Sequence, residues 1–116
     1  MKHLLLLFFA GMSATMMIVS CEKKPITTAT CTTTISYSAD IVPILSQNCT
    51  GCHNSSNASG GYNLTTHANV SSGANTILKS MRHSSGTAKM PQGSAQLPST
   101  TVDKFDCWIQ QGMPNN

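Results

Sequence analysis

Charged and aromatic residues are scarce in this chain of 116 residues. Seven Lys or Arg and four Asp or Glu make up 9% of the sequence, and aromatic residues make up 5%. No basic stripe is present, which excludes an electrostatic surface for nucleic acid. So few charges also exclude strong electrostatic steering of a protein partner. Neither a β alternation nor an internal repeat is found, so the pattern predicts an all-α fold.

The first twenty residues have the pattern of an export signal. A basic start, Met1–His3, precedes an apolar stretch, 4–19, that is short beside the roughly 17–25 residues of a membrane-spanning helix. The stretch ends at Ile18-Val19-Ser20-Cys21, which resembles the lipobox of bacterial lipoproteins. This resemblance implies that cleavage leaves Cys21 as a lipidated N-terminus, exported to the periplasmic side. The alternative is ordinary signal cleavage beside an incidental cysteine, and Glu22 favours the outer membrane by the enterobacterial sorting rule.

Composition divides the chain into three segments. Residues 1–20 form the signal peptide, and residues 21–35 are rich in Thr and predict a flexible tether behind the lipid. Residues 36–116 form one small domain. A domain of this size is marginally stable unless a cofactor or a cross-link supports its core.

The stretch Cys49-Thr50-Gly51-Cys52-His53 has the C-x-x-C-H pattern by which c-type haem is attached. Two thiols three positions apart on one helical turn can each add to a vinyl group of the same haem, and His53 can bind the iron. A redox dithiol and half of a zinc site are alternatives. The dithiol would want a βαβ context and the zinc site a second close ligand pair, and the sequence offers neither. The pattern therefore predicts one covalent haem c.

Two of the five cysteines have no role in lipidation or haem attachment. Cys31 lies before the first predicted helix and Cys107 lies in the last one. An oxidising compartment would let them pair, and a bridge that closes most of the domain would stabilise it by about 4 kcal/mol. The alternative is two separate buried thiols.

A second axial ligand for haem iron is sought among the methionines and histidines of the domain. Met90 precedes a proline in an irregular loop flanked by glycines, where a thioether can reach across a haem face. Met81 falls on the apolar face of a predicted helix, which is typical of a core residue. Met113 lies at a C-terminus expected to fray. His67, His83 or an open site complete the alternatives, and both histidines are expected to be surface imidazoles.

Apolar periodicity predicts short helices separated by polar loops. A first helix over 41–48 should be capped within Tyr37–Asp40, with Pro43 tolerated in its first turn. The stretch 54–61 is a turn-rich loop. Two further helices are expected over 62–70 and 75–82. A last helix should open with a capping box at Thr100–Asp103 and stop before Gly112 and Pro114.

The order of these motifs resembles a class I cytochrome c domain. More narrowly, it resembles the small cytochrome c domains of Bacteroidetes-type lipoproteins, which share the D-I-x-P-I-L run found here at Asp40–Leu45. The resemblance covers residues 36–113. It implies three to five short helices around one haem, with His53 as proximal and Met90 as distal ligand, and Trp108 or Phe105 packed where the first and last helices cross. No Arg or second Trp stands out for the haem propionates, which departs from the family pattern.

The expected function is that of a mono-haem electron carrier, without enzymatic activity of its own. The resemblance implies transient encounters with redox donors and acceptors that are periplasmic or membrane-associated, and we expect a monomer. A peroxidase-like haem enzyme or gas sensor with an exchangeable distal site is the alternative, although peroxidase chemistry would want a distal acid–base residue and usually a second haem. A haemless domain that uses Cys49 and Cys52 as a dithiol is a third possibility.

Overall fold

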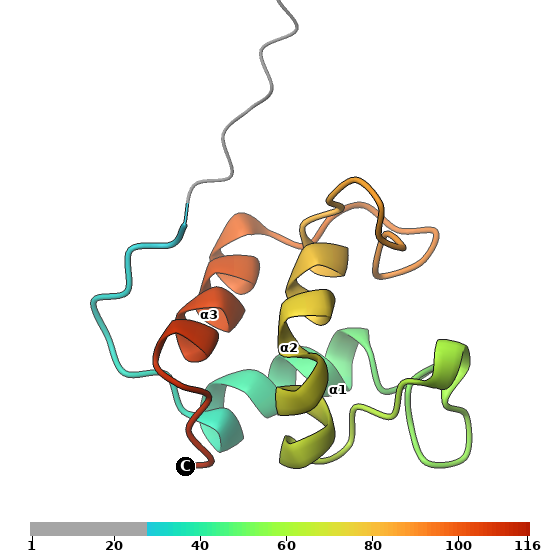
Figure 1. The fold of residues 1–116 in the computed structure, drawn as a ribbon, viewed down its shortest axis with the longest axis horizontal. Helices are drawn as coiled ribbons and strands as arrows, with labels where there is room; N and C mark the ends of the chain where they lie inside the picture. Colours follow the sequence, from blue (N-terminus) through green and yellow to red (C-terminus); the bar gives the residue numbers. More distant parts are fainter. Residues whose placement is uncertain (1–27) are drawn as a thin grey trace, which may run out of the picture.

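The computed structural model describes residues 28–116, which are helical and contain no regular strand (Figure 1). The elements are the π-helical turn η1 (Tyr37–Ile41), α1 (Val42–Asn48), the 3₁₀ turn η2 (Ser59–Gly61), α2 (His67–Met81) and α3 (Ser99–Gln110). The all-α prediction is confirmed. The predicted signal peptide and the predicted lipid-bearing Cys21 lie outside the described residues. Within the described part, no helix is both long and apolar enough to span a membrane.

The first helix combines η1 and α1, which follow one another without a break. Its cap is Ser36, whose hydroxyl accepts a hydrogen bond from the Ala39 N–H at 3.2 Å. The cap therefore lies one residue before the predicted range. Asp40, expected among the caps, accepts from the Ser36 N–H at 2.9 Å, and Pro43 lies in the first turn of α1 as predicted.

One long helix, α2, replaces the two helices predicted over 62–70 and 75–82. Thr66 caps it, because its hydroxyl accepts from the Asn69 N–H at 3.3 Å. Gly73 in the middle of α2 does not end the helix, since the apolar face continues across it and tertiary packing outweighs the weak propensity of one glycine. The residues of that buried face are Val70, Ala74, Ile77, Leu78 and Met81.

The third helix begins at Ser99, after Pro98, and has no side-chain cap. The capping box predicted at Thr100–Asp103 is therefore not formed. The helix ends as predicted, with Gly112 at a φ of 84° just beyond it.

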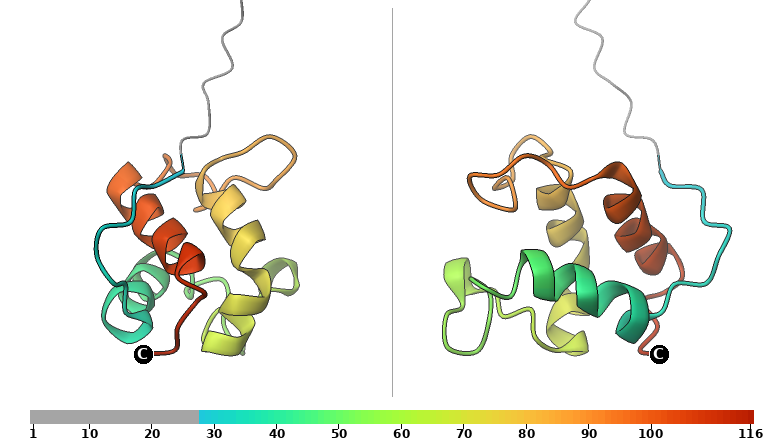
Figure 2. Two further views of the ribbon diagram at one scale, coloured as in Figure 1. Left: turned by 60° about the vertical axis from the view of Figure 1, so that its left-hand side comes forward. Right: turned by 180° about the vertical axis from the view of Figure 1, so that it is seen from behind.

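The core lies where α2 and α3 stand side by side across the first helix (Figure 2). Trp108 and Phe105 of α3 are fully buried. The Trp108 ring packs on Tyr37 of η1 with ring centroids 5.5 Å apart, so an aromatic residue lies where the first and last helices meet. The buried aromatic cluster fixes the relative placement of these two helices.

Residues 29–35, here called the N-terminal strap, are attached to α3 and the residue after it. The Ala29 N–H donates to Asp106 Oδ2 at 3.1 Å, and the Ile35 N–H donates to Gln111 Oε1 at 2.9 Å. A disulfide joins Cys31 to Cys107, with Cα atoms 5.4 Å apart. The flexible tether predicted through residue 35 is therefore wrong for the strap, which belongs to the folded domain.

The last residues are also held against the helices, in contrast to the frayed end expected from the sequence. The Trp108 indole N–H donates to the Pro114 carbonyl at 3.0 Å. The Tyr37 N–H donates to Asn116 Oδ1 at 2.8 Å. Residues 113–116 thus cover the junction between η1 and α3.

Candidate haem-attachment site

The five residues of the C-x-x-C-H motif form the turn that ends α1. The Cys49 N–H donates to the Leu45 carbonyl at 2.8 Å, which continues the helical hydrogen-bond pattern into the motif. The His53 N–H then donates to the Cys49 carbonyl at 3.0 Å, and the Cys52 N–H donates to the same carbonyl at 3.2 Å. This tight turn keeps both thiols and the imidazole within one short stretch of helix-like backbone.

Neither cysteine of the motif is disulfide-bonded, so both thiols are available for thioether formation. Their environments differ. Cys49 packs against the hydrophobic core, and burial raises the pKa of its thiol to about 11. Cys52 is exposed. One thiol therefore lies at the edge of the core and the other on the open side of the turn.

His53 is fixed through its backbone and carries an unsatisfied ring nitrogen. Its carbonyl accepts from the Leu64 N–H at 2.8 Å, and it forms an isolated bridge with Ala58. The Tyr62 ring stands edge-on to the imidazole at a centroid distance of 6.3 Å. The Nδ1 atom of His53 is buried without a hydrogen-bond partner. Because such a buried nitrogen costs free energy, this imidazole fits a group that the chain itself does not supply.

The loop after the motif, residues 54–61, is closed by its own side chains. Asn54 Oδ1 accepts from the N–H groups of Ser56 and Asn57 at 2.9 and 2.8 Å. Asn54 Nδ2 donates back to the Thr50 carbonyl at 2.8 Å. These Asx-type bonds fold the loop locally and tie it to the haem motif.

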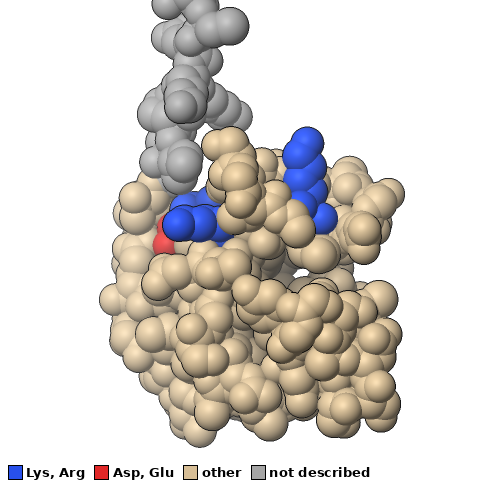
Figure 3. All heavy atoms as spheres, turned by 45° about the vertical axis from the view of Figure 1, so that its right-hand side comes forward, with Lys and Arg blue, Asp and Glu red and all other residues tan. Residues whose placement is uncertain are grey.

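Met90 lies in the loop between α2 and α3, residues 82–98. This loop and the loop of the C-x-x-C-H motif project on the same side of the molecule, one above the other, in Figures 1 and 2. Figure 3 shows that this side is hollowed between an upper and a lower part. Met90 and Pro91 are half-buried. The arrangement gives Met90 access to the same side of the molecule as the motif.

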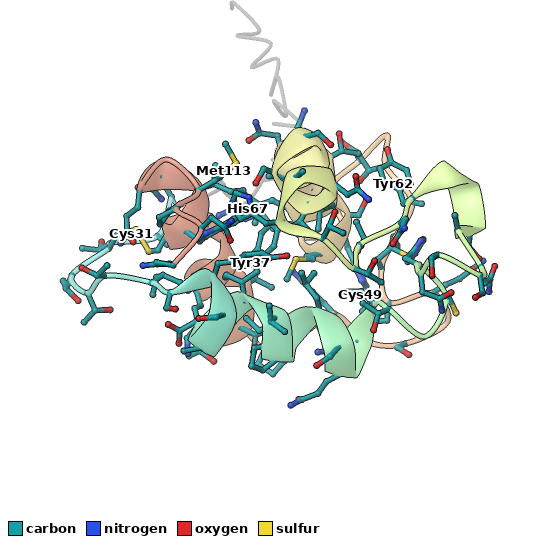
Figure 4. All side chains as sticks on the ribbon, turned by 90° about the horizontal axis from the view of Figure 1, so that it is seen from below. Cys31, Tyr37, Cys49, Tyr62, His67 and Met113 are labelled. Carbon is teal, nitrogen blue, oxygen red and sulfur yellow. A yellow bond between two sulfur atoms is a disulfide. The ribbon has the colours of Figure 1, made fainter. Side chains whose placement is uncertain are left out.

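Met113 and His67, two alternative ligands, lie at the other end of the first helix. His67 Nε2 donates to the Met113 carbonyl at 2.9 Å. The His67 ring stands edge-on to Tyr37 of η1 at 4.7 Å, whereas Cys49 follows the opposite end of this helix (Figure 4). The expectation of a surface imidazole is therefore wrong for His67, which packs against the aromatic cluster. Both residues are engaged away from the motif.

Met81 and His83 lie at and just beyond the end of α2. Met81 is buried in the core, as predicted. His83 is half-buried, and its Nε2 lies 3.1 Å from the Met90 carbonyl oxygen. Sequence reasoning missed this contact. The available signal was the seven-residue spacing of His83 and Met90 around a glycine-containing loop, which permits a closed turn without requiring one.

The one arginine of the domain is paired rather than free for a propionate. Arg82 Nη2 lies 2.7 Å from Asp106 Oδ2, and this carboxylate also accepts from the strap. The ion pair connects α2 and α3. The departure from the family pattern noted in the sequence therefore persists in the structure.

The residues of this site fit haem c. Two free thiols and an imidazole lie on one turn, and one imidazole nitrogen has no protein partner. The two loops on this side, residues 46–63 and 82–101, contain no buried side chain. Burial of apolar surface against a macrocycle would give both loops the packing partner that their own polar sequence does not provide.

Comparisons with protein-family models, curated proteins and solved structures find no match for this chain. Among residues 28–116, no three His, Cys, Asp or Glu side chains gather in a way that could hold a metal ion. The chemistry of the site therefore rests on the residues described above.

Proposed function

We propose that the protein is a mono-haem c-type cytochrome that carries single electrons between membrane-associated or periplasmic redox partners. The observation that carries the proposal is the Cys49–His53 turn, with two free thiols and a buried imidazole nitrogen that has no partner. A redox dithiol or a zinc half-site would give no role to this imidazole at the fifth position.

The helical arrangement supports a small cytochrome c fold. A first helix that leads into the haem motif and a last helix that crosses it through Trp108 match the pattern implied by the resemblance. The two polar loops would lie against the two faces of the haem. Trp108 and Phe105 would hold the helices in place on the side away from the solvent.

Each residue of the site has a separate task in this function. Cys49 and Cys52 hold the haem by thioether bonds, and His53 and Met90 are its axial ligands. The haem supplies one-electron exchange at its iron. A thioether ligand opposite an imidazole raises the reduction potential because the soft sulfur favours ferrous iron.

The cellular setting of the proposal follows from the N-terminal sequence. A lipidated Cys21 would anchor the domain to a membrane on the periplasmic side, with the outer membrane favoured. Few charges on the domain match weak, transient encounters with a redox donor and a redox acceptor.

The test is covalent haem attachment in a host with a cytochrome c assembly system. We expect the wild-type chain to keep its haem after denaturation, because thioether bonds survive unfolding. The Cys49→Ser/Cys52→Ser variant should lose it. The matched control is Cys31→Ser/Cys107→Ser, which removes the other cysteine pair and should still carry covalent haem. Denaturing electrophoresis with haem staining gives the answer.

The visible spectrum then separates the two haem functions. Sharp reduced bands, with the weak red charge-transfer band of methionine–iron ligation in the oxidised form, would support electron transfer. A high-spin spectrum that shifts with carbon monoxide would support the enzyme or sensor function instead. A wild-type chain without haem would contradict both functions and leave the dithiol.

A further inference from the structure

We propose that His83 is a positioning residue that holds the Met90 segment in place as the distal ligand. The proposal rests on the proposed function, because a distal ligand has meaning only if haem is attached at Cys49 and Cys52. It concerns a contact between two residues of the chain itself. The sequence analysis assigned His83 no such role.

Both backbone polar groups of Met90 are bonded to the end of α2. The Met90 N–H donates to the Ser80 carbonyl at 3.1 Å. The Met90 carbonyl accepts from His83 Nε2 at 3.1 Å, since a carbonyl oxygen can only accept and the ring nitrogen must donate. Two bonds on opposite sides of one residue restrict the rotation of its peptide groups and so direct its side chain.

The rest of the 85–97 segment has no comparable attachment to the helices. Its other hydrogen bonds close local turns, from Thr87 to the Ser84 carbonyl and from Ser94 to the Pro91 carbonyl. No side chain from residue 82 to residue 101 is buried. Without a core of its own, this segment depends on the two bonds at Met90 for its position.

The backbone of His83 aims its ring toward Met90. His83 has a φ of 52°, in the left-handed region that ends α2. Glycine adopts this conformation more readily than other residues, so helix termination by itself would favour glycine at this position. A histidine there loses that advantage but provides the donor that reaches the Met90 carbonyl.

Three variants of His83 separate the side-chain bond from the backbone role. His83→Ala removes the donor, and His83→Gly removes the donor while it favours the positive φ. His83→Gln keeps a donor nitrogen at the same number of bonds from Cα. His67→Gln is the matched control, because His67 donates through the same nitrogen to the Met113 carbonyl at 2.9 Å, at the other end of the first helix.

The first readout is carbon monoxide affinity of the reduced, haem-loaded protein, since carbon monoxide must displace the Met90 sulfur. A hydrogen bond of ordinary strength corresponds to a change of roughly tenfold. We expect His83→Ala and His83→Gly to bind carbon monoxide roughly tenfold more tightly, with a weaker charge-transfer band in the oxidised form. His83→Gln and His67→Gln should behave as the wild type. A silent His83→Gly together with an impaired His83→Ala would show a backbone role only and overturn the proposal.

The second readout needs no haem and keeps the two proposals distinct. In the haem-free protein, hydrogen exchange of the Met90 amide should be roughly tenfold faster in His83→Ala and His83→Gly than in the wild type and His83→Gln. Equal rates in all four proteins would overturn the positioning role even if the cytochrome function holds. Conversely, faster exchange in a chain that never takes up haem would keep the contact and contradict the cytochrome.

A third outcome concerns His83 as an iron ligand. If the wild-type spectrum lacks the methionine band and His83→Ala converts a low-spin haem to a high-spin one, His83 binds the iron itself. That result would replace the positioning role with ligation.

Discussion

The helical part of the domain and its two loops are stabilised by different means. The helical part, made of the strap, the first helix, α2, α3 and the last residues, contains every buried side chain of the described chain. It also contains the disulfide and both ion pairs found among residues 28–116. The loops, residues 46–63 and 82–101, contain the candidate ligands and no buried side chain.

This difference separates stability from the proposed chemistry. The helical part holds together through apolar burial and cross-links that the chain provides for itself. The loops present thiols, an imidazole and a methionine in polar sequence, and they are suited to pack against a prosthetic group. The predictions below test this separation in order of decreasing effect.

The largest effect is expected from loss of the disulfide. Cys31 and Cys107 are 76 positions apart in the sequence, so the bridge restricts most of the unfolded domain. The Cys31→Ser/Cys107→Ser variant should lose about 4 kcal/mol of unfolding free energy. Urea denaturation followed by Trp108 fluorescence measures it. An unchanged midpoint would mean that the helical part does not depend on its cross-link.

The ion pair between α2 and α3 should come next. Asp106→Ala leaves the half-buried Arg82 and the Ala29 N–H without their common acceptor, which should cost about 3 kcal/mol. Asp103→Ala, on the same helix, is the control and should change stability by less than about 0.5 kcal/mol. Equal losses in the two variants, measured by urea denaturation, would argue against a special role for the pair.

The boundary between the two parts runs through the haem motif, and thiol reactivity locates it. Burial raises the pKa of Cys49 to about 11, so very little of it is thiolate at pH 8, whereas Cys52 is exposed. In haem-free protein, iodoacetamide should alkylate Cys52 on the order of a hundredfold faster than Cys49. Peptide mass spectrometry over time measures both rates. Similar rates would place Cys49 outside the packed region.

The smallest effect is expected at the start of the first helix, in acid. The Ser36 N–H and Lys104 hold the pKa of Asp40 below its usual value of 3.8. A lowered pKa stabilises the fold above the ordinary pKa, and this contribution is lost as pH falls through the folded value. Asp40→Asn should cost less than about 1 kcal/mol at pH 7 and nothing measurable at pH 2. A difference between the two proteins that grows in acid would reverse the assignment.

Much of the local structure was predictable because it depends on near neighbours. The apolar spacing gave the helical class, and Pro43 and Gly112 lie where their restricted or permissive backbones suggest. The boundaries were predicted less well. The break expected between 70 and 75 is absent, since the apolar face of α2 packs as one surface.

The candidate site divides in the same way. The grouping of Cys49, Cys52 and His53 follows from their spacing on one turn. The role of His67 in the aromatic cluster and the contact of His83 with Met90 did not follow. Both contacts depend on where a distant segment returns to the helix end.

The sequence by itself determined the helical class and the attachment turn, because hydrogen bonds between residues three or four apart and apolar periodicity are written in short stretches. Only the tertiary structure decided that Cys31 meets Cys107, that the strap joins α3 and that the Met90 loop returns to the end of α2. These contacts join residues far apart in the chain. Their formation depends on the packing of whole helices, which no local pattern encodes.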